Sequence, residues 1–356
     1  MQYLITRNNI ESNAAFQRML DKTQVLTQKF GMEEVIKNRL THSYEVATSA
    51  EIIAKSISTG QFHGDYQNAV YNVSLLHDIG HPPFGHDGSD ILNKRFKNLG
   101  VEEGFSDNNN NFVVIEKNDI EVSNYELASL IKYPKKLYKS QAHYVDVLEN
   151  AIDQDIMYFK KYVKISKRPE RTLACEIMDE ADCNTYTCAD LADCYSMELA
   201  DSNRLVELRK SKKFTSQDIK DVLNIAITVI DLKDKNLIKK AFAEIKLMFN
   251  MNYYLAEDLK LKPVNKEIEE LRDELAKISY ETYIKSDYTN RKTSEEREHL
   301  EKYVDYVLEN EFYPSVYYSR EIKKAKTDLD KYSLIRDMLA DTTDNFVKKF
   351  CIEKKL

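Results

Sequence analysis

Residues 77–88 of this chain read HDIGHPPFGHDG, and they contain three of the protein's seven histidines and three of its eight glycines. The His77-Asp78 doublet offers one imidazole and one carboxylate to the same cation. His81 and His86 add two more titratable imidazole rings within the same twelve residues. Three histidines beside two prolines and three glycines are an unusual composition for an ordinary surface loop. The stretch therefore predicts a metal site.

The composition is that of an ordinary soluble globular protein. The 356 residues are 42% apolar, which is enough to bury one large core or two modest ones. The formal net charge of −7 does not indicate nucleic-acid binding through bulk charge, because surfaces that follow a phosphate backbone usually carry a basic excess. Nucleic acid is therefore not an expected partner.

Cysteine content and the N-terminus bear on the cellular compartment. Five cysteines in a long chain do not suggest a disulfide framework and fit a reducing compartment. The first residues, MQYLITRNNIESN, lack the basic start and apolar stretch of a signal peptide, and no run approaches the roughly 18 apolar residues of a membrane helix. We expect a cytoplasmic protein without a membrane partner.

The distribution of glycine predicts an all-α fold. No glycine follows Gly104, and hairpins usually need Gly or Asn at positive backbone angles. Apolar residues at helical spacing over 218–232 agree with this prediction. We expect helices at about 41–58, 66–77, 89–98, 124–131, 142–163 and 173–198, with breaks at Pro134, Pro169, Pro263 and Pro314. The simplest partition is a core of residues 1–262 and a C-terminal helical subdomain of residues 263–356 packed on it.

Further metal ligands are expected outside the doublet. His42, in RLTHS, lies on a predicted helix, and a fourth ligand should be a carboxylate. The segment MDEADCNTYTCADLADC spaces five residues by 3, 4, 4 and 3, which at about 100° per residue places them on one helical stripe: Asp179, Asp182, Tyr186, Asp190 and Asp193. Such a stripe is more often a solvated helix face, and we expect His63, His143 and His299 to be ordinary satisfied or solvated residues.

The ordered motifs resemble the HD-domain metallophosphohydrolases and, within them, the deoxyguanosine triphosphate triphosphohydrolase family. The resemblance covers most of the chain. It is carried by FQRMLDKTQV (16–25), RLTHSYEVA (39–47), LLHDIGHPPFGHDG (75–88), IKYP (131–134), MDEADCNTYTCADL (178–191) and IRDMLADTTDNF (335–346). A lone HD doublet is weak evidence, whereas the ordered set is specific. The implied architecture is an HD-type helical core with the additional C-terminal subdomain.

The resemblance implies a role for each matching residue. The metal ligands would be His42, His77, Asp78 and Asp182, and the metal Mn²⁺ or Mg²⁺, with Fe, Co or Zn also compatible. Tyr186 would pack against the nucleotide, while Asp190 and Gln24 would hold the 3′-hydroxyl of a deoxyribose. Arg39, Lys132 and Tyr133 would contact the phosphate chain; for the last two, a solvated loop is an almost equally good interpretation.

The reaction implied by the resemblance is hydrolysis at the α-phosphorus of a deoxynucleoside triphosphate, which yields deoxynucleoside and triphosphate. Among the possible substrates, the resemblance favours dGTP. His86 would position or deprotonate water or protonate the leaving oxygen, and His81 would donate to phosphate. The sequence departs from the family at Ser89, where a carboxylate commonly partners the His86 position, and at Cys183. Asp107 in FSDNNNNF is the residue that could replace the missing carboxylate.

Two other functions stay open. An HD phosphohydrolase could act instead on a nucleoside monophosphate or a cyclic nucleotide, for which Asp190 and Lys132 should matter little. A protein that has lost turnover through Ser89 could bind or sense nucleotides without hydrolysing them. By analogy with the family, we also expect a homo-oligomer and a nucleotide effector.

Overall fold

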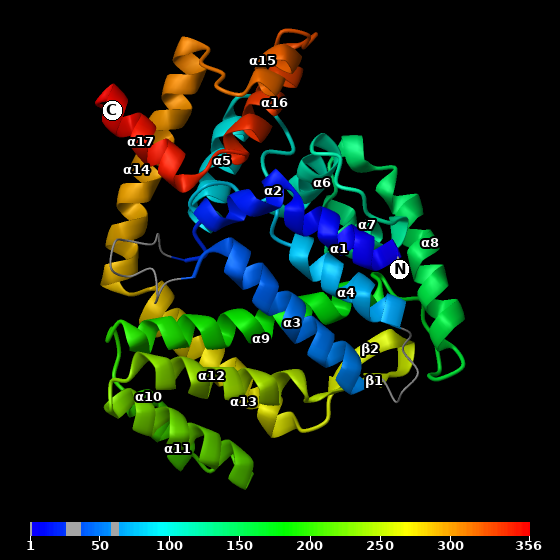
Figure 1. Ribbon diagram of the computed structural model, residues 1–356, viewed down its shortest axis with the longest axis vertical. Coiled ribbons are helices and arrows are strands. Elements are labelled where there is room, and N and C mark those ends of the chain that lie inside the picture. Colours follow the sequence, from blue (N-terminus) through cyan, green and yellow to red (C-terminus); the bar gives the residue numbers. More distant parts are fainter. Residues whose placement is uncertain (1, 26–36, 58–63) are drawn as a thin grey trace.

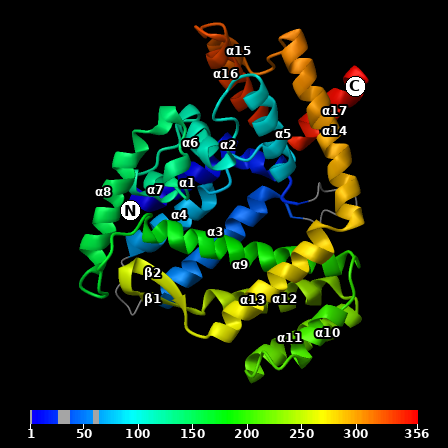
Figure 2. The same ribbon diagram turned by 180° about the vertical axis from the view of Figure 1, so that it is seen from behind.

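The computed structural model describes residues 2–25, 37–57 and 64–356. It confirms the all-α fold: the described residues form seventeen α-helices and one antiparallel hairpin (Figures 1 and 2). Among the described helices, none combines the length and apolar character needed to cross a membrane. Short 3-10 turns and one π-helical turn, Tyr280–Ile284, connect some of the helices.

The elements follow one another along the chain as follows: α1 (Gln2–Ser12), α2 (Ala14–Gln17), α3 (Arg39–Ile57), α4 (Gly64–Leu76), α5 (Gly85–Asn98), α6 (Asp107–Lys117), α7 (Asn124–Ser129), α8 (Tyr144–Phe159), α9 (Leu173–Ser196), α10 (Asn203–Lys210), α11 (Gln217–Asp231), α12 (Lys235–Asn250), β1 (Tyr253–Ala256), β2 (Lys260–Pro263), α13 (Lys266–Ser279), α14 (Asp287–Asn310), α15 (Val316–Ile322), α16 (Asp328–Ala340) and α17 (Asp344–Lys354).

Three helices from distant parts of the sequence form the centre of the molecule. α3 and α4 pack against each other, and both pack against α9, as the two ribbon views show (Figures 1 and 2). On α3, the buried residues Val46, Ala50, Ile53 and Ile57 recur every three or four positions, which gives the helix one continuous apolar face. This packing brings the first turn of α3, the end of α4 and the middle of α9 together.

Two further apolar clusters lie on either side of this centre. One joins α5 to α14, α16 and α17, and the other joins the C-terminal half of α9 to α10, α11, α12 and α13. α13 begins just after the predicted boundary at residues 262 and 263, and it packs on α9 and α12. That boundary stays a prediction.

The start of α5 differs from the sequence expectation. The helix begins at Gly85 and not near residue 89, and its N-cap residue is Phe84, which has a left-handed φ of 60°. This turn follows the two adjacent prolines directly and redirects the chain, so that the helix starts early. His86 therefore lies in the first turn of a helix and not in a loop. The four expected proline breaks are confirmed, since all four residues lie outside the α-helices.

The hairpin shows how a turn forms without glycine. Asp258 and Leu259, between β1 and β2, each adopt a φ of 57°, a region that L residues visit at a cost. The Asp258 carboxylate accepts hydrogen bonds from the backbone N–H groups of Ser166 and Lys167. These contacts hold the turn in a conformation for which the composition offered no signal.

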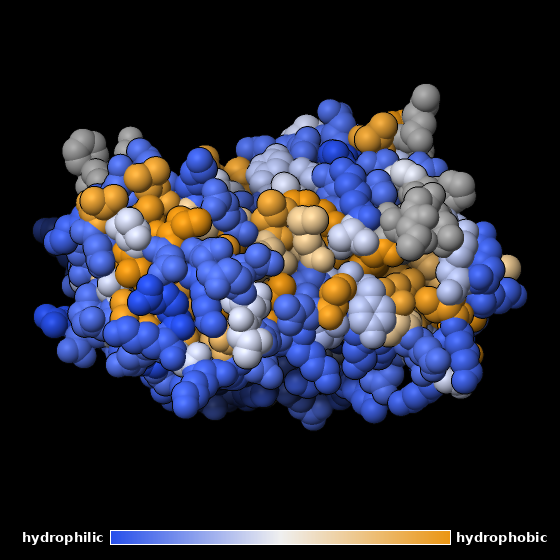
Figure 3. All heavy atoms as spheres, turned by 90° about the horizontal axis from the view of Figure 1, so that it is seen from below, coloured by the Kyte–Doolittle hydropathy of each residue, from blue (hydrophilic) through white to orange (hydrophobic). Residues whose placement is uncertain are grey.

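The surface at the α10–α11 end carries apolar side chains in several patches that hydrophilic residues separate (Figure 3). The exposed large apolar residues of α11 and the residue after it are Ile225 and Leu232, and those of α12 are Leu237 and Leu247. Scattered exposed residues of this kind are normal for a folded protein.

Asp155 on α8 should make stability fall as pH rises. Its buried carboxylate accepts hydrogen bonds from the Tyr125 hydroxyl (2.8 Å) and the Leu173 backbone N–H (2.7 Å), and burial raises its pKa to about 7. The folded protein therefore keeps a proton that the unfolded chain loses above pH 4. Relative to Asp155→Asn, the wild type should lose about 2–4 kcal/mol of unfolding free energy between pH 4.5 and 7.5. Urea denaturation across this range measures the difference, and a pH-independent difference would contradict it.

Candidate metal centre

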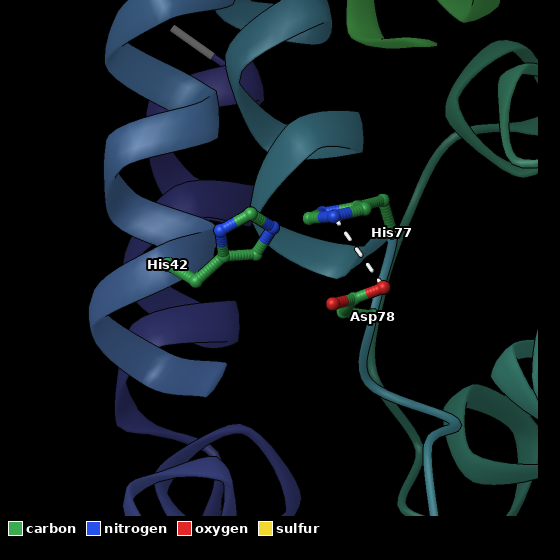
Figure 4. Close-up of side chains that lie close together, drawn as sticks. All are labelled: His42, His77 and Asp78. Carbon is green, nitrogen blue, oxygen red and sulfur yellow. Dashed lines mark ion pairs between the residues drawn. The ribbon is translucent and has the colours of Figure 1, made fainter. Parts of the chain in front are cut away.

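Two imidazoles and two carboxylates converge where α3, α4 and α9 meet. His42 comes from the first turns of α3, His77 and Asp78 follow the end of α4, and Asp182 comes from the middle of α9. His42 Nε2 lies 3.0 Å from Asp182 Oδ1, and His77 Nε2 lies 3.6 Å from the same oxygen and 3.4 Å from Asp78 Oδ1. Figure 4 shows the His42 and His77 rings and the Asp78 carboxylate pointing toward one another.

These four side chains fit a divalent cation. Ligand atoms that share one ion through bonds of about 2.0–2.2 Å lie roughly 3–4 Å apart, which is the spacing found here. The His77 ring places Nδ1 2.7 Å from the Ser74 carbonyl oxygen, which leaves the buried Nε2 without a hydrogen-bond partner and facing both carboxylates. A backbone acceptor on the outer ring nitrogen is the usual way to orient a metal-ligating histidine.

Cationic groups flank the two carboxylates. Arg39 Nη1 donates to Asp78 Oδ2 at 2.6 Å, while Nε and Nη2 of this buried guanidinium have no hydrogen-bond partner. Lys132 Nζ lies 3.4 Å from Asp182 Oδ2 and 3.2 Å from Asp179 Oδ1. Burial by itself would raise the pKa of Asp78 and of Asp182. The attraction of the neighbouring histidines and cations is larger than this effect of burial and holds both pKa values well below the usual range. Both carboxylates are therefore ionised and ready to bind a cation.

A second group of side chains lies next to the first. His81 Nδ1 is 3.2 Å from Asp78 Oδ1, and His81 Nε2 is 2.9 Å from Asp107 Oδ2. The His86 ring packs edge-on to the His81 ring, with 5.6 Å between centroids, and one ligand atom from each of His81, His86 and Asp107 lies within 4.8 Å of the others. Desolvation and the neighbouring His81 and Arg39 lower the pKa of His86. The His86 ring is therefore neutral at pH 7 and still reaches solvent.

Two residues of the asparagine run 108–111, Asn110 and Asn111, hold the loop of residues 77–84 (the metal-site loop) in place, a role that we did not anticipate. Asn111 donates to the His77 carbonyl and accepts from the Gly80 N–H, both at 2.7 Å, and Asn110 donates to the Gly80 carbonyl at 2.7 Å. Gly80 has no room for a side chain, because an added Cβ would lie 2.3 Å from the Asn111 backbone nitrogen. A run of four asparagines at the start of a helix, directly after a predicted catalytic residue, was the available signal.

The tight turn before His86 brings it near Arg39. Gly85 has a φ of 56°, and a Cβ at this position would come within 2.9 Å of Arg39 Nη2. Ser89, one turn after His86, has a buried hydroxyl without a hydrogen-bond partner. The next residue, Asp90, faces away and lines a groove of about 580 Å³ between α5 and α14. Asp107 of α6 supplies a carboxylate within 4.8 Å of the His86 ring, whereas the Asp87 carboxylate of α5 pairs with Arg297.

The residues expected to hold the nucleotide occupy different environments. Asp190 is buried, and burial together with the nearby Asp193 raises its pKa to about 8. The Gln24 side-chain oxygen is buried without a hydrogen-bond partner. Tyr186 is 39% exposed, and its hydroxyl lies 3.3 Å from Cys183 Sγ. Tyr133 is 52% exposed and contacts Lys136.

The Asp179–Asp193 stripe is not uniformly solvated. Asp190 and Asp193 are 7% and 4% exposed, whereas Asp179 forms ion pairs with Lys132 and Arg171 near the surface. Of the remaining histidines, His143 is exposed, as expected. His299 is half-buried on α14, and its Nδ1 is buried without a hydrogen-bond partner, which differs from the expectation of a satisfied or solvated ring. His63 lies outside the described residues. All five cysteines are free thiols.

Metal binding should distinguish Asp182 from Asp179, its neighbour one turn earlier. Asp182→Ala removes a carboxylate that faces both His42 and His77, so the bound Mn²⁺ should fall at least tenfold when metal and protein are mixed in equal amounts. Asp179→Ala removes only the ion pairs with Lys132 and Arg171 and should bind metal like the wild type. Metal content by plasma mass spectrometry and affinity by calorimetry measure this. Equal losses in the two variants would exclude Asp182 as a specific ligand.

Comparison with known proteins agrees with this geometry. The HD domain family model matches residues 39–183, which include all four converging residues. The deoxyguanosinetriphosphate triphosphohydrolase-like protein 2 of Deinococcus radiodurans is 26% identical over 291 residues, 70% of this chain and 66% of that protein. A relative in Wolinella succinogenes, named deoxyguanosinetriphosphate triphosphohydrolase-like protein, is 34% identical over 155 residues, 42% of this chain and 40% of that protein.

A third relative extends the similarity along the chain. The protein of the same name in Leptospira interrogans is 24% identical over 359 residues, 96% of this chain and 87% of that protein. The matches to the Deinococcus and Wolinella proteins, by contrast, span less than two thirds of their lengths. Residues 39–183 of the chain match the HD domain family model, and the relatives to which the chain is similar carry the name deoxyguanosinetriphosphate triphosphohydrolase-like protein.

Proposed function

We propose that this protein is a metal-dependent hydrolase of deoxynucleoside triphosphates, with dGTP as the first substrate to test, and that it releases deoxynucleoside and triphosphate. The observation that carries the proposal is the convergence of His42, His77, Asp78 and Asp182 beside the His81, His86 and Asp107 group. The names of the relatives support the choice of substrate.

The four converging residues would hold Mn²⁺ or Mg²⁺, with Fe, Co or Zn as alternatives. A divalent cation bound there would polarise a phosphate oxygen and lower the pKa of a bound water. Arg39 supports the proposal because its Nε and Nη2 groups are buried and unpaired, so that donors remain for a phosphate oxygen while Nη1 stays on Asp78. Lys132 would contribute a second positive charge next to Asp182.

His86 is our candidate for the general base or acid. Its lowered pKa leaves an unprotonated ring nitrogen at pH 7, which can accept a proton from water and later return it to the leaving oxygen. Asp107 pairs with His81 and lies within reach of the His86 ring. We propose that Asp107 supplies the negative charge that Ser89 cannot supply, acting through His81.

The deoxyribose would bind at the far end of the α9 stripe. The eight residues from Asp182 to Asp190 span about 12 Å of helix, which is long enough to separate a phosphate site from a sugar site. The unpaired Gln24 oxygen can accept a hydrogen bond from a hydroxyl group, and a protonated Asp190 can donate one. Tyr186, which is partly exposed between them, would cover the nucleotide, and Tyr133 would lie at the outer end of the phosphates.

A screen of substrates against metals tests the proposed reaction. The purified protein, incubated with each dNTP and with Mn²⁺, Mg²⁺, Co²⁺, Fe²⁺ or Zn²⁺, should release deoxynucleoside and intact triphosphate, measured by anion-exchange chromatography. Release of pyrophosphate or single phosphate would contradict the proposal. Metal-dependent dNTP binding in calorimetry without product would instead identify a nucleotide-binding protein that lacks turnover.

His86 should matter for turnover and not for metal binding. His86→Ala should lower kcat about 10²- to 10⁴-fold, because it removes the proton-transfer group and leaves the four metal ligands in place. His143→Ala, which changes an exposed histidine on the surface, is the matched control and should keep full activity. Steady-state kinetics and metal content together separate the two effects. A His86→Ala enzyme with wild-type kcat would remove His86 from the mechanism.

Two further substitutions distinguish the triphosphate from smaller substrates. Asp190→Ala and Lys132→Ala should each lower kcat/KM for dGTP at least tenfold, since one removes a proposed sugar contact and the other a proposed phosphate contact. Activity toward nucleoside monophosphates or cyclic nucleotides should depend little on either residue. If such a substrate is turned over faster than any dNTP and both variants retain that activity, the alternative phosphohydrolase is the correct assignment.

A further inference from the structure

Asp344, at the start of α17, is a buried carboxylate whose hydrogen bonds all go to remote segments of the chain. It is 2% exposed. Its Oδ2 accepts hydrogen bonds from the Thr23 backbone N–H (2.9 Å) and the Thr23 hydroxyl, and its Oδ1 accepts one from the Phe84 backbone N–H (2.9 Å). One carboxylate therefore joins segments that are 321 and 260 residues away in sequence.

Both segments lead directly into the candidate site. Thr23 precedes Gln24, the proposed sugar contact, and Phe84 lies two residues before His86, the proposed proton-transfer group. Phe84 has a left-handed φ of 60°, a conformation that an aromatic residue adopts only when its surroundings hold it there. The Asp344 carboxylate accepts the backbone N–H of this strained residue and so stabilises the turn.

Lys22 adds a second connection between the same three segments. Its buried Nζ donates to the His81 carbonyl at 2.5 Å and to the Ala340 carbonyl, at the end of α16, at 2.9 Å. Figure 1 shows the junction of α16 and α17 beside the start of α5 and the N-terminal segment. The C-terminal helices thus contact the loop after Asp78 at Phe84 and the N-terminal segment at Lys22 and Thr23, and Lys22 in turn contacts that loop at His81.

We propose that Asp344 is a positioning residue for the active site: it holds the Phe84 turn, and with it His86, against the segment that carries Gln24. Without the carboxylate, two buried backbone N–H groups lose their acceptor, and the strained turn can relax. The four metal ligands lie on α3, α9 and the end of α4, outside this connection. Loss of Asp344 should therefore displace the reacting groups and leave the metal in place. The catalytic part of this inference rests on the proposed function.

Asp341, three residues earlier, provides a matched control. It is also a largely buried carboxylate with three donors, but its partners are Arg18, Lys117 and Tyr318, none of which belongs to the proposed site. A general loss of C-terminal packing would affect Asp341→Ala and Asp344→Ala alike. A positioning role would affect only Asp344→Ala.

Hydrogen exchange reports the connection directly. In Asp344→Ala, the amides of Phe84 and Thr23 should exchange at least tenfold faster, and in Asp341→Ala they should exchange as in the wild type. Metal content should be unchanged in both variants. With dGTP, kcat should fall at least tenfold in Asp344→Ala, recover in part in Asp344→Asn, which keeps one acceptor oxygen, and stay within about twofold of wild type in Asp341→Ala.

Several results would overturn the proposal. Wild-type protection of Phe84 and Thr23 in Asp344→Ala would do so, as would equal losses of kcat in the Asp344 and Asp341 variants. If Asp344→Ala does not fold, Asp344→Asn carries the test, and wild-type exchange together with wild-type kcat in that variant counts against the role. A wild type that hydrolyses no dNTP would refute the proposed function, whereas the exchange comparison would still decide whether Asp344 holds the two segments.

Discussion

The ionised Asp78 carboxylate, placed almost out of contact with water, is the interaction on which the site depends. An isolated carboxylate in a protein interior costs several kcal/mol, so it needs charged or hydrogen-bonding partners. Asp78 has a 2.6 Å contact with Arg39 and lies 3.4 and 3.2 Å from the rings of His77 and His81. These partners come from α3, the end of α4 and the following loop. The charge of Asp78 is therefore balanced only when these three segments are folded together.

The loop after Asp78 is held by hydrogen bonds to its backbone as well as by the burial of Ile79 and Phe84 in the apolar clusters. The asparagine side chains of α6 bind its backbone at His77 and Gly80, Lys22 of the N-terminal segment binds it at His81, and Asp344 of α17 binds it at Phe84. Backbone polar groups in a buried loop must find partners within the protein. Here side-chain amides, the Lys22 amine and one carboxylate supply them, and the same hydrogen bonds set the positions of the histidines.

Sequence reasoning reached the fold class and the residues that converge at the centre, but it missed the groups that support them. The absence of glycine after Gly104 predicted helices, and the HD doublet, His42 and the α9 stripe each carried a recognisable chemical pattern. Asn110 and Asn111 offered only a polar run directly after Asp107, and Asp344 offered no pattern, because a neutral amide or a single carboxylate in a helix usually faces water. The early start of α5 was missed for a related reason: it depends on a left-handed Phe84, and that conformation is held by Asp344 from far along the chain.

The sequence by itself determined local properties: helical periodicity, the positions of breaks, and which side chains are able to bind a metal or transfer a proton. These follow from spacing along one segment and from the chemistry of each residue type. The resemblance pointed to Asp182 and to Asp107, but spacing alone did not select them, and only the tertiary structure brought Asp182 to the histidines, Asp107 to His81 and His86, and α17 to the loop after Asp78. Such pairings depend on how helices hundreds of residues apart pack together, and the side-chain distances that result are set by that packing and not by any local pattern.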